Sequence, residues 1–212
     1  IFTIFFAAMV VASAVAYLLV PKLIPLLLPG FADDPSLSDL ILSARIMLLS
    51  PFLLGLSNLF SSLTQMHRRF LVYAASPLFY NASIILGVIV LYPMFGIAGL
   101  AIGVALGALF HMAIQIPFML ESGLLPRFTS AIDWVSIKRA ALLSLPRTIT
   151  MSANQLATFF LTALASLMSK GSIAVFSLSF NLQSVPLTII GASYSSAVFP
   201  DLSKLYASGN QS

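Results

Sequence analysis

The side chains that could contact a polar ligand are concentrated between positions 140 and 199, where hydroxyl and amide groups recur among apolar residues. Side chains three or four positions apart share one face of a helix. Two such stripes are present: Thr148, Ser152, Gln155, Thr158, Thr162 and Ser166 form the first, and Ser177, Asn181, Ser184 and Thr188 form the second. Hydroxyls can bond their own helix or a neighbouring one, but the additional amides favour a hydrated cavity. The candidate substrate-binding residues are Asn154, Gln155, Thr158, Asn181 and Ser184, together with Arg147.

Arg147 is the sharpest single candidate, because it lies eight positions beyond Arg139. That spacing places it about 12 Å along a helix from the end of a polar segment. An arginine inside a membrane costs free energy unless it is solvated or paired. Its long side chain can snorkel to the surface as a structural anchor. Alternatively, its guanidinium group suits the oxygens of a phosphate bound in a cavity.

Patterns typical of catalytic and metal sites are missing from the sequence. It has no cysteine, no HExxH string and no phosphate-binding glycine loop. His111 and Gln115 lie one helical turn apart, but a single histidine without a second ligand is a weak metal signal. We therefore expect no enzymatic activity, no metal and no cofactor.

The composition indicates that lipid surrounds the elements that position these residues. Of 212 residues, 59% are hydrophobic and 8% are charged, against about 25% charged in soluble globular proteins. This argues against a soluble domain and a nucleic-acid-binding module. A helix needs about 20 residues to cross a bilayer, so the length allows roughly six crossings. Because the chain starts at Ile1 and enters an apolar stretch at once, we expect a fragment of a longer protein.

The apolar stretches predict six spans: 1–20, 46–65, two within 70–120, 140–169 and 172–199. All except 140–169, which contains Arg147, are free of charge. A turn at 92–96 would separate the third span from the fourth. In the fourth, Gly99, Gly103 and Gly107 at four-residue spacing predict a close contact with another helix.

Several residues are expected to bound or interrupt these spans. Pro21, Lys22 and Pro25 should disturb the first helix, and Arg45 should be an interfacial anchor before the second. The fifth should be interrupted at Pro146 and Arg147, and Pro186 with Gly191 can break the sixth.

The distribution of lysine and arginine predicts the orientation. One set of loops and the tail hold six basic residues, Arg68, Arg69, Arg127, Lys138, Arg139 and Lys204. The opposite set holds two, Lys22 and Lys170. Loops richer in lysine and arginine face the cytoplasm, so Ile1 and the tail are predicted to be cytoplasmic.

Short strings along the whole chain resemble those of the MurJ (MviN) family of lipid II flippases, in the multidrug/oligosaccharidyl-lipid/polysaccharide (MOP) exporter superfamily. They are PGFAD at 29–33, RIM at 45–47, RF at 69–70 with Asn81, QIP at 115–117, GLLPR at 123–127, Gln155, GS at 171–172, FPDLS at 199–203 and ASGN at 207–210.

The resemblance implies an all-α polytopic protein of the bacterial cytoplasmic (inner) membrane, in which two lobes of a fourteen-helix transporter surround a cationic cavity. This chain would supply helices three to eight. Residues 1–120 would complete the first lobe, 121–139 would form a cytoplasmic linker between the lobes, 140–199 would begin the second lobe and 200–212 would form a cytoplasmic tail.

The implied function is translocation of lipid II, a polyprenyl-pyrophosphate-linked precursor for peptidoglycan synthesis, by alternating access. The implied partners are this lipid-linked substrate and membrane lipids, without nucleic acid; a coupling ion is not identified. Where the family usually has a Tyr-Ala-Asp-Arg-Leu string, this chain has LSFNL at 178–182, so Asn181 takes the place of the arginine. Two alternatives therefore stay open: an exporter of another lipid-linked polysaccharide or, with cation coupling, of drugs; and a transport-inactive scaffold.

The charge bias generates a topology prediction. Single cysteines at Ser130 and Pro35, in full-length protein free of other cysteines, should be labelled from opposite sides of the membrane, Ser130 only from the cytoplasm. Labelling of both positions by an impermeant thiol reagent added outside would contradict the orientation.

Overall fold

The computed structural model describes residues 2–126, 128, 129 and 133–207, and this part of the chain contains helices and turns but no strand. The expected all-α architecture is confirmed. Ser130 and the end of the expected tail, residues 208–212, lie outside the described residues.

The long helices are α1 (Phe2–Leu27), α3 (Leu49–Met66), α4 (Phe70–Leu86), α6 (Ile97–Ala113), α8 (Trp134–Ser166) and α9 (Ser172–Ala207). The shorter elements are η1 (Pro29–Phe31), α2 (Leu37–Met47), the π-helical segment η2 (Gly87–Leu91), α5 (Tyr92–Phe95) and α7 (Ile116–Glu121).

Five helical stretches are long and apolar enough to cross a membrane. They are Phe2–Leu27, Leu37–Met66, Leu71–Phe95, Ile97–Glu121 and Ser172–Gly191. They correspond to five of the six expected spans. The remaining expected span, 140–169, coincides largely with α8, which has 33 residues and is the least hydrophobic of the long helices. Its role as a sixth span stays a prediction.

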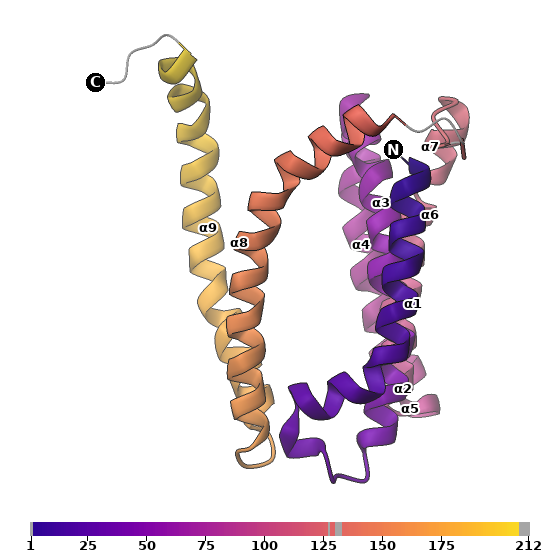
Figure 1. Ribbon diagram of the computed structural model, residues 1–212, viewed down its shortest axis with the longest axis vertical. Coiled ribbons are helices and arrows are strands. Elements are labelled where there is room, and N and C mark those ends of the chain that lie inside the picture. Colours follow the sequence, from indigo (N-terminus) through magenta and orange to yellow (C-terminus); the bar gives the residue numbers. More distant parts are fainter. Residues whose placement is uncertain (1, 127, 130–132, 208–212) are drawn as a thin grey trace.

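The helix breaks expected at prolines are wrong. Helix α1 continues through Pro21 and Pro25 to Leu27, α8 continues through Pro146, and α9 continues through Pro186 and Gly191. A proline removes one backbone hydrogen bond from a helix, but ending the helix in lipid would leave several backbone groups without partners. In α8 the hydroxyl of Thr150 donates a hydrogen bond of 3.1 Å to the carbonyl oxygen of Pro146. Figure 1 shows that α8 curves along its length, as proline-containing helices commonly do.

Two expected boundaries also move. The second span begins at Leu37 instead of residue 46, because α2 and α3 are separated only by Leu48. Arg45 therefore lies within a helix, with its guanidinium carbon 4.6 Å from the ring centre of Tyr17 in α1. This cation–π contact joins α2 to α1, and the role of Arg45 as an interfacial anchor stays a prediction. The turn at 92–96 is reduced to Gly96, whose φ of 59° only glycine adopts readily.

Close contact of α6 with α4 and its continuation η2 is confirmed at the predicted glycines. Gly99, Gly103 and Gly107 are all buried. A methyl group added at Gly103 would lie 2.6 Å from Cα of Gly87, and one at Gly99 would lie 2.2 Å from the carbonyl oxygen of Leu91. Contacts between backbones at this range need glycine, and they favour helix association where no hydrophobic effect separates helix from lipid.

The opposite neighbours of α6 present small polar side chains. Ser43, Ser50, Ser57 and Thr64 recur every seven residues along α2 and α3, and all four are buried. Both helices pack against α6, whose buried residues are glycines and alanines. Helix α6 is therefore the centre of a tight bundle that includes α2, α3 and α4.

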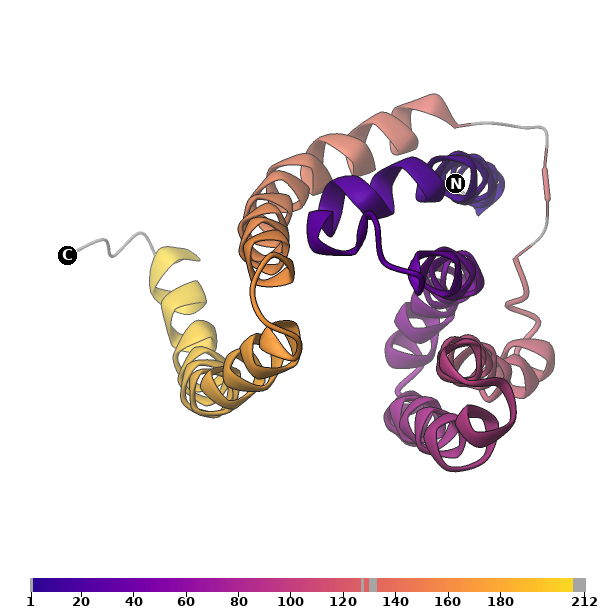
Figure 2. The ribbon, with the colours of Figure 1, turned by 90° about the horizontal axis from the view of Figure 1, so that it is seen from below.

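The elements form two groups. Figure 2 shows α8 and α9 to one side of the bundle that contains α1, α3, α4 and α6. The start of α1, α7 and the end of α9 lie at one end of the molecule, whereas η1 and the turn between α8 and α9 lie at the other (Figure 1). Successive loops thus lie at alternate ends of the molecule, as the predicted orientation requires.

The glycine contact predicts a stability effect. Gly103→Ala should destabilise the full-length protein by about 1–3 kcal/mol, because the methyl group would meet the backbone of Gly87 and force the helices apart. Thermal unfolding of purified protein in detergent measures this.

The matched control is Gly191→Ala, where no atom of the described residues lies within 4 Å of the added methyl group. That substitution should leave the melting temperature unchanged or slightly raised, because alanine favours helix over glycine by about 1 kcal/mol. Equal melting temperatures for both variants would show that the α4–α6 contact is loose.

Candidate functional site

The six candidate residues all lie on α8 and α9, which form an antiparallel hairpin. Helix α8 starts at Trp134, where the carboxylate of Asp133 accepts hydrogen bonds from the backbone N–H groups of Val135 and Ser136. Hydrogen bonding from Ser136 holds the pKa of Asp133 below its ordinary value. The helix therefore begins within the segment that the sequence analysis assigned to the linker.

The hydroxyl groups of the two stripes bond mainly to their own helices. Thr158 donates to the carbonyl oxygen of Asn154 at 3.1 Å, and Ser184 donates to that of Asn181 at 2.7 Å. Thr148 and Thr162 do the same one turn back along α8. These hydroxyls are already satisfied as donors, so their presence alone does not require water or a ligand.

The amide groups are different. The side chains of Asn154, Gln155 and Asn181 are exposed, and within the described part of the chain none of them makes a hydrogen bond. An amide has two donor hydrogens and an acceptor oxygen, and in lipid each unmet group costs free energy. These amides need water, a ligand or another helix, so they carry the case for a polar cavity.

Arg147 and Asn181 lie at different depths in the hairpin. Arg147 is 20 residues before Leu167 and Asn181 is 10 residues after Gly171, so their levels differ by about 15 Å along the helices. Arg147 is exposed, and no described acid forms an ion pair with it. Arg147 therefore does not replace, at the level of Asn181, the positive charge that an arginine would supply there.

The hairpin meets the first helix group at the end that holds the α8–α9 turn, and the linker before the hairpin meets the same group at the other end. At the end that holds the start of α1, the ring of Phe128 packs 5.3 Å from Phe2 and 5.2 Å from Phe6, measured between ring centres. The backbone N–H of Thr129 donates to the hydroxyl of Thr3 at 3.0 Å. At the opposite end, the backbone N–H of Gly30 donates to the hydroxyl of Ser166 at 3.2 Å.

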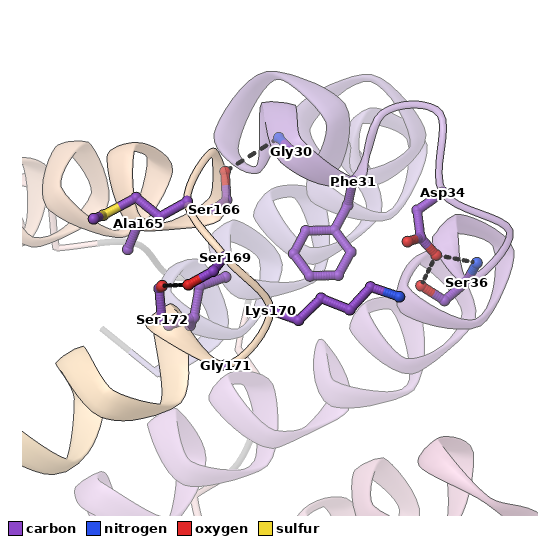
Figure 3. Close-up of a pocket in the computed structure, with 12 residues that line it drawn as sticks. Gly30, Phe31, Asp34, Ser36, Ala165, Ser166, Ser169, Lys170, Gly171 and Ser172 are labelled. Atoms are coloured by element: carbon purple, nitrogen blue, oxygen red, sulfur yellow. Dashed lines mark hydrogen bonds between the residues drawn. The ribbon is translucent and has the colours of Figure 1, made fainter.

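A cavity of about 560 Å³ lies beside the Gly30 contact, between η1 and the α8–α9 turn. Figure 3 shows the side chain of Lys170 extending past the ring of Phe31 toward Asp34 and Ser36. Lys170 entered the predicted orientation only as a loop charge. Because Gly30 and Ser166 are 136 positions apart, no local pattern predicts their contact.

His111 and Gln115, considered above as a weak metal signal, belong to a hydrogen-bond network between α6 and α3. Nδ1 of His111 lies 2.7 Å from the hydroxyl of Ser57, which also accepts a bond of 2.7 Å from the amide of Gln115. Ser61 donates to the Gln115 carbonyl oxygen at 3.1 Å. Among the described residues no group of three His, Cys, Asp or Glu side chains could hold a metal. The network joins helices: Ser57 and Ser61 lie one turn apart on α3 and face His111 and Gln115, which also lie one turn apart. These matching spacings are the signal in the sequence for this contact.

Exposure of the amides predicts a labelling pattern. Cysteines at Gln155, Thr158 and Asn181 of the full-length protein should react with water-soluble thiol reagents at least several-fold faster than cysteines at Phe159 and Ile189. The first three would line a hydrated cavity, and the last two would face apolar surroundings. Labelling rates measured in membranes test this, and equal protection of all five positions would mean that the stripes form dry helix contacts.

Comparison with known proteins matches the whole chain to one family. A family model described as lipid II flippase MurJ covers residues 1–212. "Probable lipid II flippase MurJ" of Buchnera aphidicola subsp. Acyrthosiphon pisum is 34% identical over 190 residues, 85% of this chain and 36% of that protein. The protein of the same name from Vibrio cholerae is 30% identical over 138 residues, 64% of this chain and 26% of its own length. That from Rickettsia prowazekii is 23% identical over 216 residues, 99% of this chain and 42% of its own length.

The chain thus spans about a third of the length of its curated relatives, 36% in the Buchnera protein. The strings at 29–33, 123–127 and 199–203 are spread over the region that the family model matches. Five apolar helices in the described residues fit a protein that crosses the membrane repeatedly. The chain therefore belongs to the MurJ lipid II flippase family and is a multi-pass protein of the bacterial inner membrane.

Proposed function

We propose that the full-length protein translocates lipid II across the cytoplasmic membrane and that this chain supplies its third to eighth helices. The observation that carries the proposal is the family match over every residue of the chain. The relatives' own name, probable lipid II flippase, supports the choice of cargo. The cargo is moved without chemical change, so the protein is a transporter and not an enzyme.

The arrangement of the helices supports alternating access. Helices α2, α3 and α4 pack around α6, and α1 packs against α2 and α3, whereas α8 and α9 stand to one side of this group. We assign the first group to one lobe, the hairpin to the start of the other, 121–139 to the linker and 200–212 to the tail. Two lobes that contact each other at limited points can rock as rigid bodies around a central binding site.

The hairpin would form one wall of the cargo cavity. The amides of Asn154, Gln155 and Asn181 can donate to and accept from the polar headgroup of a lipid-linked sugar. Thr158 and Ser184 donate to their own helices, but their oxygens can still accept hydrogen bonds. We assign the anion contact to Arg147, because a guanidinium group binds phosphate oxygens through two parallel hydrogen bonds.

One observation favours a different cargo within the same superfamily. Asn181 stands where the resemblance places an arginine, and Arg147 is too far along the hairpin to replace it. A cavity with less positive charge suits a less anionic lipid-linked polysaccharide, or a drug exported with cation coupling. A scaffold without transport activity would also tolerate this change.

The proposal predicts a graded response at Arg147. In proteoliposomes with full-length protein and lipid II, Arg147→Gln should lower the flipping rate at least tenfold, because it removes the charge that meets the pyrophosphate. Arg147→Lys should retain part of the rate, since it keeps the charge but loses the paired hydrogen bonds.

Arg139→Gln is the matched control, because it removes the same charge from the same helix eight residues earlier, where the side chain is also exposed. It should flip lipid II at close to the parent rate. If the parent protein moves another lipid-linked sugar but not lipid II, the proposal that lipid II is the cargo is wrong. Parent-like flipping by Arg147→Gln at matched protein level would instead make Arg147 a snorkelling anchor.

A further inference from the structure

The contact between η1 and the end of α8 is unusually close for segments so far apart in sequence. A methyl group at Gly30 would lie 1.7 Å from the carbonyl oxygen of Ser166 and 2.5 Å from its carbonyl carbon. The two backbones therefore touch, and any side chain at Gly30 would push them apart. The N–H of Gly30 bonds the Ser166 hydroxyl, which in turn donates to the carbonyl oxygen of Ala163 at 2.6 Å.

A second interaction spans the same gap. The carboxylate of Asp34 accepts bonds from the hydroxyl of Ser36 at 2.6 Å and from its backbone N–H at 2.8 Å. These bonds hold the pKa of Asp34 below its ordinary value, so the group is charged at neutral pH. The ammonium group of Lys170 extends toward this fixed carboxylate (Figure 3). Attraction between such exposed charges is weak and easily reversed.

Little else holds the two segments together. A cavity of about 560 Å³ lies between the two segments. Six of its lining residues carry hydroxyl or charged groups: Asp34, Ser36, Ser166, Ser169, Lys170 and Ser172. At the opposite end the linker between the two groups packs on α1, through the ring of Phe128 against Phe2 and Phe6. A contact that is geometrically specific but only weakly held can open and close without unfolding either helix group.

We propose that Gly30, Asp34, Ser166 and Lys170 form a latch that closes the outer end of the space between the two helix groups. The latch must open for cargo to leave on that side. The linker contact at Phe128 is the pivot, because it keeps the groups joined while their outer ends separate. This inference rests on the proposed function, since it assigns the outer gate of the same transport path.

A wedge in the latch tests the inference. Gly30→Ala in the full-length protein should force η1 away from Ser166 and favour the state that is open outside. A cysteine at Thr158 should then react several-fold faster with an impermeant thiol reagent added outside. Gly191→Ala, the same substitution in open surroundings, should leave this rate unchanged. Unchanged labelling in a folded Gly30→Ala protein would overturn the latch.

A crosslink supplies the opposite perturbation and does not depend on whether Gly30→Ala folds. Asp34→Cys with Lys170→Cys, joined by a short reducible bifunctional thiol reagent, should hold the latch closed. The protein also carries a third cysteine, Asn181→Cys. After the crosslinker is quenched, an impermeant thiol reagent added outside should label this cysteine several-fold more slowly, and the rate should recover when the crosslink is reduced. Unaltered labelling after complete crosslinking would also overturn the latch. The labelling experiments need no cargo. If the latch controls access but the protein does not flip lipid II, the proposed cargo is wrong and the proposed latch stands.

Discussion

The fold depends on how closely α6 approaches its neighbours. In lipid, apolar side chains gain nothing by leaving the solvent for a helix interface, so association relies on close packing and hydrogen bonds. Helix α6 supplies both: its glycines meet the backbones of Gly87, Leu91 and Tyr80 on one side, and His111 with Gln115 binds the serines of α3 on the other. Removing either would leave α3 and α4 without a reason to pack. We infer that these close contacts make the first helix group move as one unit.

The hairpin of α8 and α9 is built on the opposite principle. Its residues are mostly exposed, its threonines bond their own backbone, and within the described residues no hydrogen bond joins a polar side chain of α8 to one of α9. Such helices can move as a unit, since their internal bonds survive a change of neighbours. A helix group joined to a self-sufficient hairpin by the linker at one end and by the Gly30–Ser166 contact at the other has the mechanical form that rocking transport requires.

The features predicted correctly from the sequence are those set by local spacing. The glycine spacing of four predicts the α6 contact, and the charge-free stretches predict the helices, because both depend on residues within one helix. The breaks expected at Pro21, Pro146 and Pro186 fail because lipid penalises an open backbone more strongly than water does. The network at Ser57 and the contact of Gly30 with Ser166 require knowledge of which helices meet. The six cavity residues stay predictions, since the surfaces that would complete the cavity lie outside this chain.

The central claim, that the hairpin rocks against a rigid helix group, is tested most directly by distances at both ends of one full-length molecule. Spin labels at Ser36 and Ser172 report on the outer end, and labels at Gln65 and Tyr194 report on the inner end. During flipping of lipid II, pulsed electron paramagnetic resonance should show the outer pair gaining a longer distance while the inner pair gains a shorter one. Distances that stay fixed at both ends, or that lengthen together, would contradict rocking about the linker.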